Sequence, residues 1–62
     1  MDDRIYSEIE AAAIRGVSVK KLQAERWRRK GMPYVKDGRR VGYLGKDIRA
    51  DIERNRVVPS AA

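Results

Sequence analysis

Three stretches of the chain place apolar residues three or four positions apart, which is the spacing of one face of an α-helix. These stretches are residues 8–15, 19–26 and 46–55. The side chains expected to face the core are Ile9, Ala12 and Ala13 in the first stretch, Val19 and Leu22 in the second, and Ile48 and Ile52 in the third. The pattern therefore predicts three short helices that share one hydrophobic core.

The starts of the first two helices carry recognisable capping residues. Ser7 and Glu10 form the sequence of a capping box, in which the serine hydroxyl and the glutamate carboxylate each bind a free backbone N–H group. Gly16 follows the first helix, at the position where a glycine in the left-handed conformation commonly ends a helix. Ser18 is a second N-cap residue, so only Gly16 and Val17 separate it from the first helix. Two helices joined by a tight turn with glycine predict a helix-turn-helix unit.

Between the second and third helices, two short extended runs are separated by a turn sequence. The runs are residues 34–36 and 40–43, and Asp37-Gly38 is a strong signal for a two-residue β-hairpin turn. Side chains alternate along a strand, so each run has a core side and a water side. The core side is expected to hold Val35, Val41 and the neighbouring pair Tyr34 and Tyr43, and the water side Lys36, Arg39 and Arg40. Together with the helices, this hairpin gives an α+β fold.

Trp27, the single tryptophan, falls outside the helical pattern. It does not lie on the stripe that begins at Leu22, and we interpret it as turning back to the core where the second helix ends, near Arg26. A stacking contact with nucleic acid is the alternative interpretation. Residues 1–4 are expected to be frayed and residues 57–62 to form a flexible tail, which leaves residues 1–56 as the domain.

Composition excludes several classes of function. With 62 residues, the chain has the size of one small domain, and it contains no Cys and no His. Disulfides, thiolate or imidazole metal sites and His-based catalysis are therefore excluded. The longest apolar run, residues 11–14, is too short for a membrane span, and the N-terminus lacks the pattern of a signal peptide. Asp47, Asp51 and Glu53 are interpreted as a solvated helix face rather than a nuclease site. We expect a soluble intracellular protein that is not an enzyme and uses no metal or cofactor.

Positive charge is concentrated in the middle of the chain. The whole protein has a net charge of +6. Residues 18–46 hold ten Lys or Arg and two acids, a net charge of +8, whereas the remainder holds five basic and seven acidic residues, a net charge of −2. A surface charged only for solubility mixes the two signs, so their segregation favours nucleic acid as the partner. A protein-interaction module without nucleic acid is the alternative, and a salt-dependent gel shift distinguishes the two.

Seven sequence elements follow one another in a characteristic order between residues 5 and 56. They are Ser7, Glu10-Ala11-Ala12, Gly16-Val17-Ser18, Leu22, Gly31-Met32-Pro33, Lys36-Asp37-Gly38-Arg39-Arg40-Val41-Gly42-Tyr43 and Asp47-Ile48. In this order and spacing they resemble the small MerR-like winged helix-turn-helix proteins, a family that includes phage excisionases and AlpA-type regulators. Two positions depart from the family pattern, because Arg15 stands where a core leucine is usual and Gly42 where a long side chain is frequent. The resemblance implies three helices and a two-stranded β-hairpin wing.

This resemblance also implies how DNA is bound. The second helix would lie in the major groove and the hairpin would reach the adjacent minor groove. The expected recognition-helix residues are Ser18, Lys20, Lys21, Gln23 and Ala24. The expected phosphate contacts are Arg26, Arg28, Arg29, Lys30 and Lys36. The expected wing residues are Gly38, Arg39 and Arg40.

The function that the resemblance implies is sequence-specific binding and bending of double-stranded DNA. An excisionase, or recombination directionality factor, bends an attachment site so that a phage integrase can excise a prophage, and it performs no chemistry itself. The expected partners are double-stranded DNA, other copies of the protein along that DNA and an integrase or recombinase, in the cytoplasm and nucleoid of a bacterial host and without a membrane. A small transcriptional regulator of the same fold is the alternative, and the sequence does not separate the two.

Overall fold

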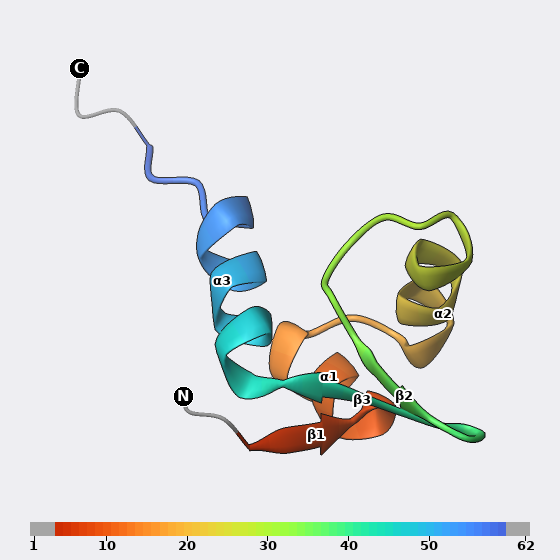
Figure 1. Ribbon diagram of the computed structural model, residues 1–62. Helices are drawn as coiled ribbons and strands as arrows, with labels where there is room; N and C mark the ends of the chain where they lie inside the picture. The colour runs from red at the N-terminus through yellow and green to blue at the C-terminus, as the bar shows by residue number, and fades with distance from the viewer. Residues whose placement is uncertain (1–3, 60–62) are drawn as a thin grey trace.

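The computed structural model describes residues 4–59 and consists of three α-helices and one three-stranded antiparallel sheet (Figure 1). In chain order the elements are β1 (Ile5–Ser7), α1 (Glu8–Arg15), α2 (Val19–Trp27), β2 (Val35–Asp37), β3 (Arg40–Leu44) and α3 (Gly45–Asn55). The α+β class and the three helices are confirmed, whereas the sheet has three strands instead of two. The predictions for residues 1–3 and 60–62 lie outside the described residues, and residues 56–59 follow α3 without helix or strand.

Both predicted N-caps are present. The Ser7 N–H donates to Glu10 Oε1 at 2.9 Å, and the Glu10 N–H donates to Ser7 Oγ at 3.1 Å, which completes the capping box. Ser18 Oγ accepts a hydrogen bond of 3.1 Å from the Lys21 N–H. Gly16 ends α1 with φ +73°, and no atom lies near the position of a Cβ there, so backbone conformation alone requires glycine. Local hydrogen bonding therefore fixes where α1 ends and α2 begins.

The strand that sequence reasoning missed is β1, which pairs with β3 in the middle of the sheet. The paired residues are Ile5 with Leu44, Tyr6 with Tyr43, and Ser7 with Gly42. The Arg4 carbonyl accepts a 2.9 Å hydrogen bond from the Gly45 N–H, so the prediction of a frayed start is wrong for Arg4. This strand has only three residues and ends on the N-cap residue Ser7, which is too short for a recognisable alternation, and its partner strand lies far along the chain. The pairing was therefore invisible to a local pattern.

The hairpin turn lies one residue later than predicted. Asp37 pairs with Arg40, so the two central residues of the turn are Gly38 and Arg39. Gly38 has φ +63°, a left-handed value that glycine adopts without strain at the first central position of a type II′ turn. The hairpin and the place of Gly38 in its turn were predicted correctly, whereas Asp37 belongs to β2 and Arg39 takes the second turn position.

Residues paired across the hairpin lie on the same face of the sheet, so Val35, opposite Gly42, lies on the other face from Val41 and Tyr43. Val35 pairs with Gly42 and is exposed, so the prediction that it faces the core is wrong. Val41 is half-buried and packs against the core, as expected. The Tyr34 and Tyr43 rings are also neighbours, with centroids 6.5 Å apart, which confirms that prediction.

Six buried residues form the core of the molecule. They are Ala11, Ala12, Leu22, Met32, Tyr43 and Ile48. Ala12, Leu22 and Ile48 confirm the helical pattern, but Ile9 is 70 % exposed and Ala13 is exposed. The core-facing side of α1 is centred on Ala11 and Ala12. Their small side chains allow β3, α2 and α3 to pack closely against α1. Ile52 is 37 % exposed and lies outside the core cluster, so the prediction that it closes the core is wrong.

Trp27 does not return to the core. Its side chain is 86 % exposed, and Met32 from the following connection is buried instead. Because α2 stays helical through Trp27, this residue lies about 140° around the helix axis from Leu22, the single buried residue of α2. The prediction of a core anchor is therefore wrong.

Candidate nucleic-acid interface

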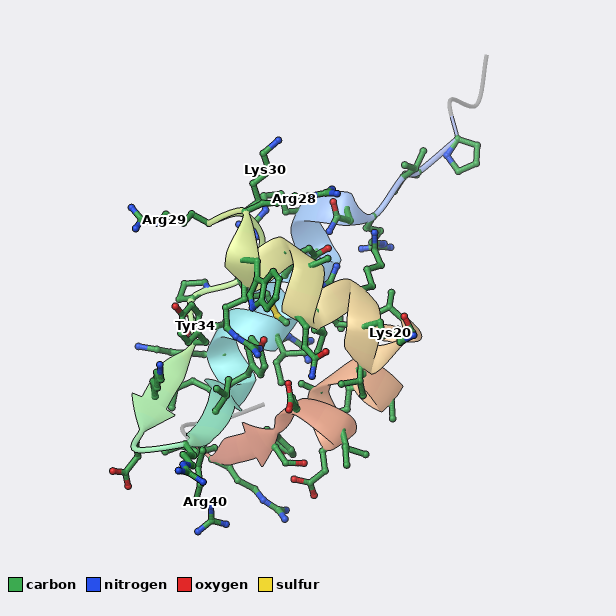
Figure 2. All side chains as sticks on the ribbon, turned by 90° about the vertical axis from the view of Figure 1, so that its right-hand side faces the viewer. Lys20, Arg28, Arg29, Lys30, Tyr34 and Arg40 are labelled. Atoms are coloured by element: carbon green, nitrogen blue, oxygen red, sulfur yellow. The ribbon has the colours of Figure 1, made fainter. Side chains whose placement is uncertain are left out.

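Two basic elements of the chain lie on the same side of the molecule. In Figure 1, α2 and the β2–β3 hairpin extend to the right, and α3 lies at the left. Figure 2 looks at that right-hand side, and its labelled cations surround α2 and the hairpin. Arg28, Arg29 and Lys30 lie beyond one end of α2, and Arg40 lies near the hairpin at the opposite end of the view.

Most Lys and Arg side chains between residues 18 and 46 form no ion pair within residues 4–59. Of the ten Lys and Arg residues in 18–46, only Lys21 and Arg26 form ion pairs within residues 4–59. We define the basic face as seven exposed residues without an ion pair in that range: Lys20, Arg28, Arg29, Lys30, Lys36, Arg39 and Arg40. Lys46, at the start of α3, is likewise without an ion pair there. Their charge is therefore not neutralised by a carboxylate of residues 4–59.

The outward side of α2 carries most of the expected recognition residues. Lys20, Gln23 and Ala24 share one side of the helix, at positions i, i+3 and i+4. Trp27 follows at i+7 on this same side, and that spacing is the signal by which its exposure was predictable. Ser18 caps the helix, and its hydroxyl hydrogen stays available as a donor. Lys21 is the exception, because its Nζ lies 3.7 Å from Glu25 Oε2 on a neighbouring side of α2.

Backbone hydrogen bonds hold the expected phosphate contacts at the end of α2. The Arg28 N–H donates to the Ala24 carbonyl at 3.0 Å, and the Lys30 N–H donates to the Glu25 carbonyl at 2.8 Å. Arg29 has φ +57°, a left-handed value that is uncommon for a residue with a Cβ. The chain thus wraps the helix end and directs three consecutive cations outward (Figure 2). Cations are favoured there in any case, because the C-terminus of a helix carries partial negative charge.

Arg26 is occupied within the fold. Its Nη1 donates to the Tyr43 hydroxyl at 3.0 Å and lies 3.4 Å from Glu8 Oε1, and its guanidinium stands 5.7 Å from the Tyr34 ring centroid. The side chain is 15 % exposed. Burial by itself lowers the pKa of Arg26, but the Tyr43 hydrogen bond and the Glu8 charge outweigh it and raise the pKa above its usual value. Arg26 therefore holds α2 against α1 and β3, and its guanidinium is not available for a phosphate contact.

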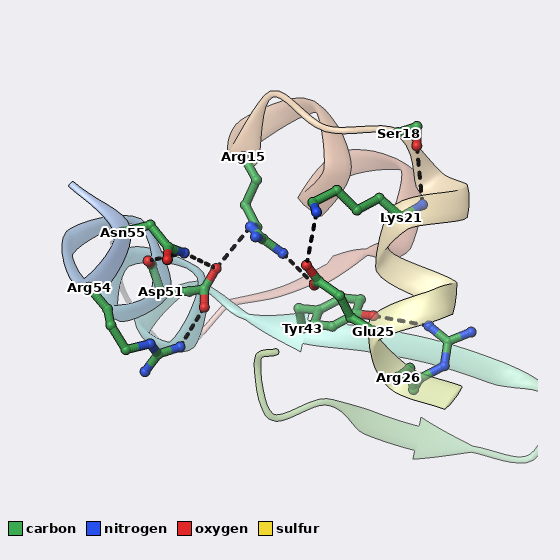
Figure 3. Close-up of polar contacts among 9 residues, drawn as sticks. All are labelled: Arg15, Ser18, Lys21, Glu25, Arg26, Tyr43, Asp51, Arg54 and Asn55. Atoms are coloured by element: carbon green, nitrogen blue, oxygen red, sulfur yellow. Dashed lines mark hydrogen bonds and ion pairs between the residues drawn. The ribbon is translucent and has the colours of Figure 1, made fainter. Parts of the chain in front are cut away.

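A second set of charges ties the three helices together (Figure 3). Arg15 of α1 donates through Nη1 to Glu25 Oε1 of α2 at 2.8 Å, and its Nε lies 2.9 Å from Asp51 Oδ2 of α3. Arg54 and Asn55 also bind the Asp51 carboxylate. We call these five residues the buried ionic cluster, since the Arg15 and Asp51 side chains are only 9 % and 4 % exposed. The cluster fixes how α2 sits relative to α1 and α3.

The interpretation of Asp51 as part of a solvated face is therefore wrong. Asp51 stands at i+3 from Ile48, and Arg15 stands at i+4 and i+3 from Ala11 and Ala12. The helical period assigns both charges to core-facing positions, and opposite charges at two such positions are the signal that was overlooked. An arginine at position 15, where the resemblance led us to expect leucine, therefore has a physical explanation in its two carboxylate partners.

No family model, curated protein or solved structure matches the chain. Over residues 4–59, no three His, Cys, Asp or Glu side chains are grouped where they would hold a metal ion. None of the three helices in that range has both the length and the apolar run needed to cross a membrane.

Proposed function

We propose that this protein binds and bends double-stranded DNA at specific sequences, as a small winged helix-turn-helix protein. In this proposal α1 and α2 are the helix-turn-helix, and the β2–β3 hairpin is the wing. The observation that carries it is that α2 and the hairpin share one side of the molecule and present seven exposed cations without an ion pair within residues 4–59. A duplex, with its closely spaced phosphates, is the polyanion that such a surface suits.

The outward side of α2 enters the major groove in this proposal. Lys20 and Gln23 read base edges through hydrogen bonds, and the Ala24 methyl group meets a thymine methyl. Ser18 supplies its hydroxyl at the start of the helix. Lys21 reads a base only by leaving Glu25, so its contribution is smaller than that of Lys20. The buried ionic cluster supports this arrangement by holding α2 in a fixed orientation.

The remaining cations bind the backbone and the minor groove. Arg28, Arg29, Lys30 and Lys36 contact phosphates on either side of the recognition helix. Gly38, Arg39 and Arg40 at the hairpin tip reach the adjacent minor groove, where a narrow A/T-rich segment attracts arginine. Pairing of β3 with β1 as well as β2 anchors this wing more firmly than a free two-stranded hairpin would be. A rigid wing and a fixed helix suit a protein that bends its site.

The role we propose is that of an excisionase acting beside a phage integrase in the cytoplasm and nucleoid of a bacterial host. The protein performs no chemistry, and several copies on adjacent sites supply the bend that the integrase needs. A transcriptional regulator would use the same contacts. An excision reaction with the integrase separates the two roles: an excisionase raises the yield of excised product, whereas a regulator leaves that yield unchanged and alters transcription from a promoter that overlaps its site.

DNA binding itself is tested by selecting sites from a random duplex pool and measuring affinity by fluorescence anisotropy at several salt concentrations. If about seven phosphates are neutralised, log K falls against log salt with a slope of about −6. Arg29→Ala should make that slope shallower by about 1, whereas Arg49→Ala, an exposed cation of α3, is the matched control and leaves it unchanged. A slope near zero would overturn the proposal.

A further inference from the structure

A hollow of about 420 Å³ lies between the C-terminal end of α2 and the hairpin. It is lined by Arg26, Trp27, Tyr34, Lys36, Gly38, Arg39 and Val41. Two aromatic side chains with water-exposed surface, Trp27 at 86 % and Tyr34 at 45 %, contribute to its walls. Its volume falls within the range of roughly 300–1,000 Å³ that is usual for ligand sites.

Trp27 is poorly explained as a structural residue. No part of residues 4–59 covers it, although burying so large an aromatic surface is among the most favourable contributions that a small domain has. It also lies on the same side of α2 as Lys20 and Ala24, where the proposed recognition contacts are. An exposed tryptophan in such a place is typical of a residue that is covered by a partner.

The charge around the hollow defines the partner. Lys36 and Arg39 have no ion pair within residues 4–59, and both line the hollow. Arg26 adds a guanidinium against the Tyr34 ring, fixed there by its hydrogen bond to Tyr43. The seven lining residues include three cations and no carboxylate. Such a site fits an occupant that is aromatic and anionic at once, which is the chemistry of a nucleotide.

We propose that this hollow binds an unpaired nucleobase, with Trp27 stacking on the base and Lys36 and Arg39 binding the adjacent phosphates. Bases in an intact duplex are already stacked on their neighbours, so the site selects single-stranded DNA or RNA, or a base displaced from a duplex. This activity goes beyond the proposed duplex binding and does not depend on it. Lys20 lies about 10 Å along α2 from Trp27, so the two contacts are separable.

The single tryptophan makes the test direct, because fluorescence excited at wavelengths that the three tyrosines do not absorb comes from Trp27 alone. The protein is titrated with an oligothymidylate of about 12 nucleotides and with an abasic strand of the same length and charge. We expect the thymidylate strand to quench Trp27 fluorescence and to bind at least about tenfold more tightly than the abasic strand. Equal binding of the two strands would mean that charge alone is recognised, and it would overturn the proposal in favour of a protein partner for the aromatic residues.

Variants separate stacking from folding. Trp27→Ala should weaken thymidylate binding about ten- to hundredfold by anisotropy of a labelled strand, and Trp27→Phe should retain most of the affinity. Ile9→Ala removes a similarly exposed apolar side chain from α1 and is the matched control. Circular dichroism should show all three variants folded, since both positions are exposed. Unchanged binding by Trp27→Ala would reject the site.

The same variants distinguish this site from the proposed function. Lys20→Ala should weaken binding to the selected duplex and leave thymidylate binding unchanged. Loss of all duplex binding with intact base-dependent strand binding would reject the proposed function and keep the nucleobase site. If duplex binding survives while the thymidylate and abasic strands bind equally, the nucleobase site is rejected and the proposed function is kept.

Discussion

The basic face and the buried ionic cluster use the same type of side chain for opposite purposes. Arg28 and Arg29 of the basic face are exposed and have no carboxylate partner within residues 4–59, whereas Arg15 of the cluster is held between Glu25 and Asp51. An unpaired, hydrated cation can replace the counterions condensed on a polyanion, and the release of those counterions favours binding. A buried arginine has lost its hydration, so its carboxylates are needed to keep the fold stable. Pairing and burial, rather than the number of cations, therefore mark the candidate binding surface.

The largest expected effect is the loss of stability on removing the Asp51 carboxylate from the buried ionic cluster. Asp51→Ala leaves Arg15 buried with one of its two carboxylates, and losing a partner of a buried ion pair costs about 3–5 kcal/mol. At roughly 0.05–0.15 kcal/mol per residue, a domain of 62 residues has a free energy of unfolding of about 3–9 kcal/mol, so the variant should lose about a third or more of it. Thermal and urea denaturation followed by circular dichroism measure the loss.

Two controls define that result. Glu53→Ala removes an exposed carboxylate from the same helix, and we expect a change within about 0.5 kcal/mol. The double variant Arg15→Leu with Asp51→Leu replaces charges by apolar groups, which is often neutral or stabilising, and it should regain most of the lost stability. If Asp51→Ala were no less stable than Glu53→Ala, the cluster would be a surface feature and the comparison would fail.

The second prediction concerns the recognition side of α2. Lys20→Ala should cost about 1–3 kcal/mol on the selected duplex and relax the sequence preference, while the midpoint of thermal unfolding stays unchanged because the side chain is exposed and has no ion pair in the described part of the chain. Competition binding against scrambled duplexes measures the preference. A uniform loss on all sequences would assign Lys20 to a phosphate instead of a base.

The third prediction concerns the hairpin. Arg39→Ala combined with Arg40→Ala should weaken binding to every duplex, make the salt slope shallower by about 2 and reduce bending, measured by energy transfer between labelled DNA ends. Stability should hardly change, since both side chains are exposed and no ion pair within residues 4–59 is lost. A double variant that binds and bends like the parent would show that the hairpin does not contact DNA.

The parts of the fold that sequence predicted correctly are those governed by local chemistry. The capping box at Ser7, the left-handed Gly16 and the Ser18 cap each depend on residues within a few positions of one another. Even there, the hairpin shows the limit of local reasoning. Asp37-Gly38 and Gly38-Arg39 both suit a tight turn, and the ladder of β2 with β3 decides the register.

The parts that sequence missed depend on distant partners. Strand β1 forms because Ile5, Tyr6 and Ser7 pair with residues of β3, and no local sequence signal near Ile5 predicts that pairing. Arg15 and Asp51 occupy core-facing positions of their helices, but only the packing of the three helices shows that they pair with each other and with Glu25. The wrong prediction that Trp27 is buried has a different cause. Its place in the helical period was correct, and the general preference of large aromatic residues for the core was given more weight than that period.

The smallest expected effect concerns Glu10, whose carboxylate belongs to the capping box and to neither the basic face nor the buried ionic cluster. Hydrogen bonds from the backbone N–H and then the side chain of Ser7 lower the pKa of Glu10 from its usual 4.5. Because the folded pKa lies below the unfolded one, ionised Glu10 stabilises the fold above pH 4.5, and this contribution is lost as the pH falls through the folded value. Glu10→Gln keeps an acceptor for the capping box but does not titrate. The parent should therefore melt slightly higher than Glu10→Gln at neutral pH, and the two melting temperatures should converge as the pH falls below 4.5. A difference that stays constant with pH would mean that the Glu10 charge contributes nothing, and affinity for the selected duplex at neutral pH should be equal because Glu10 belongs to neither the basic face nor the buried ionic cluster.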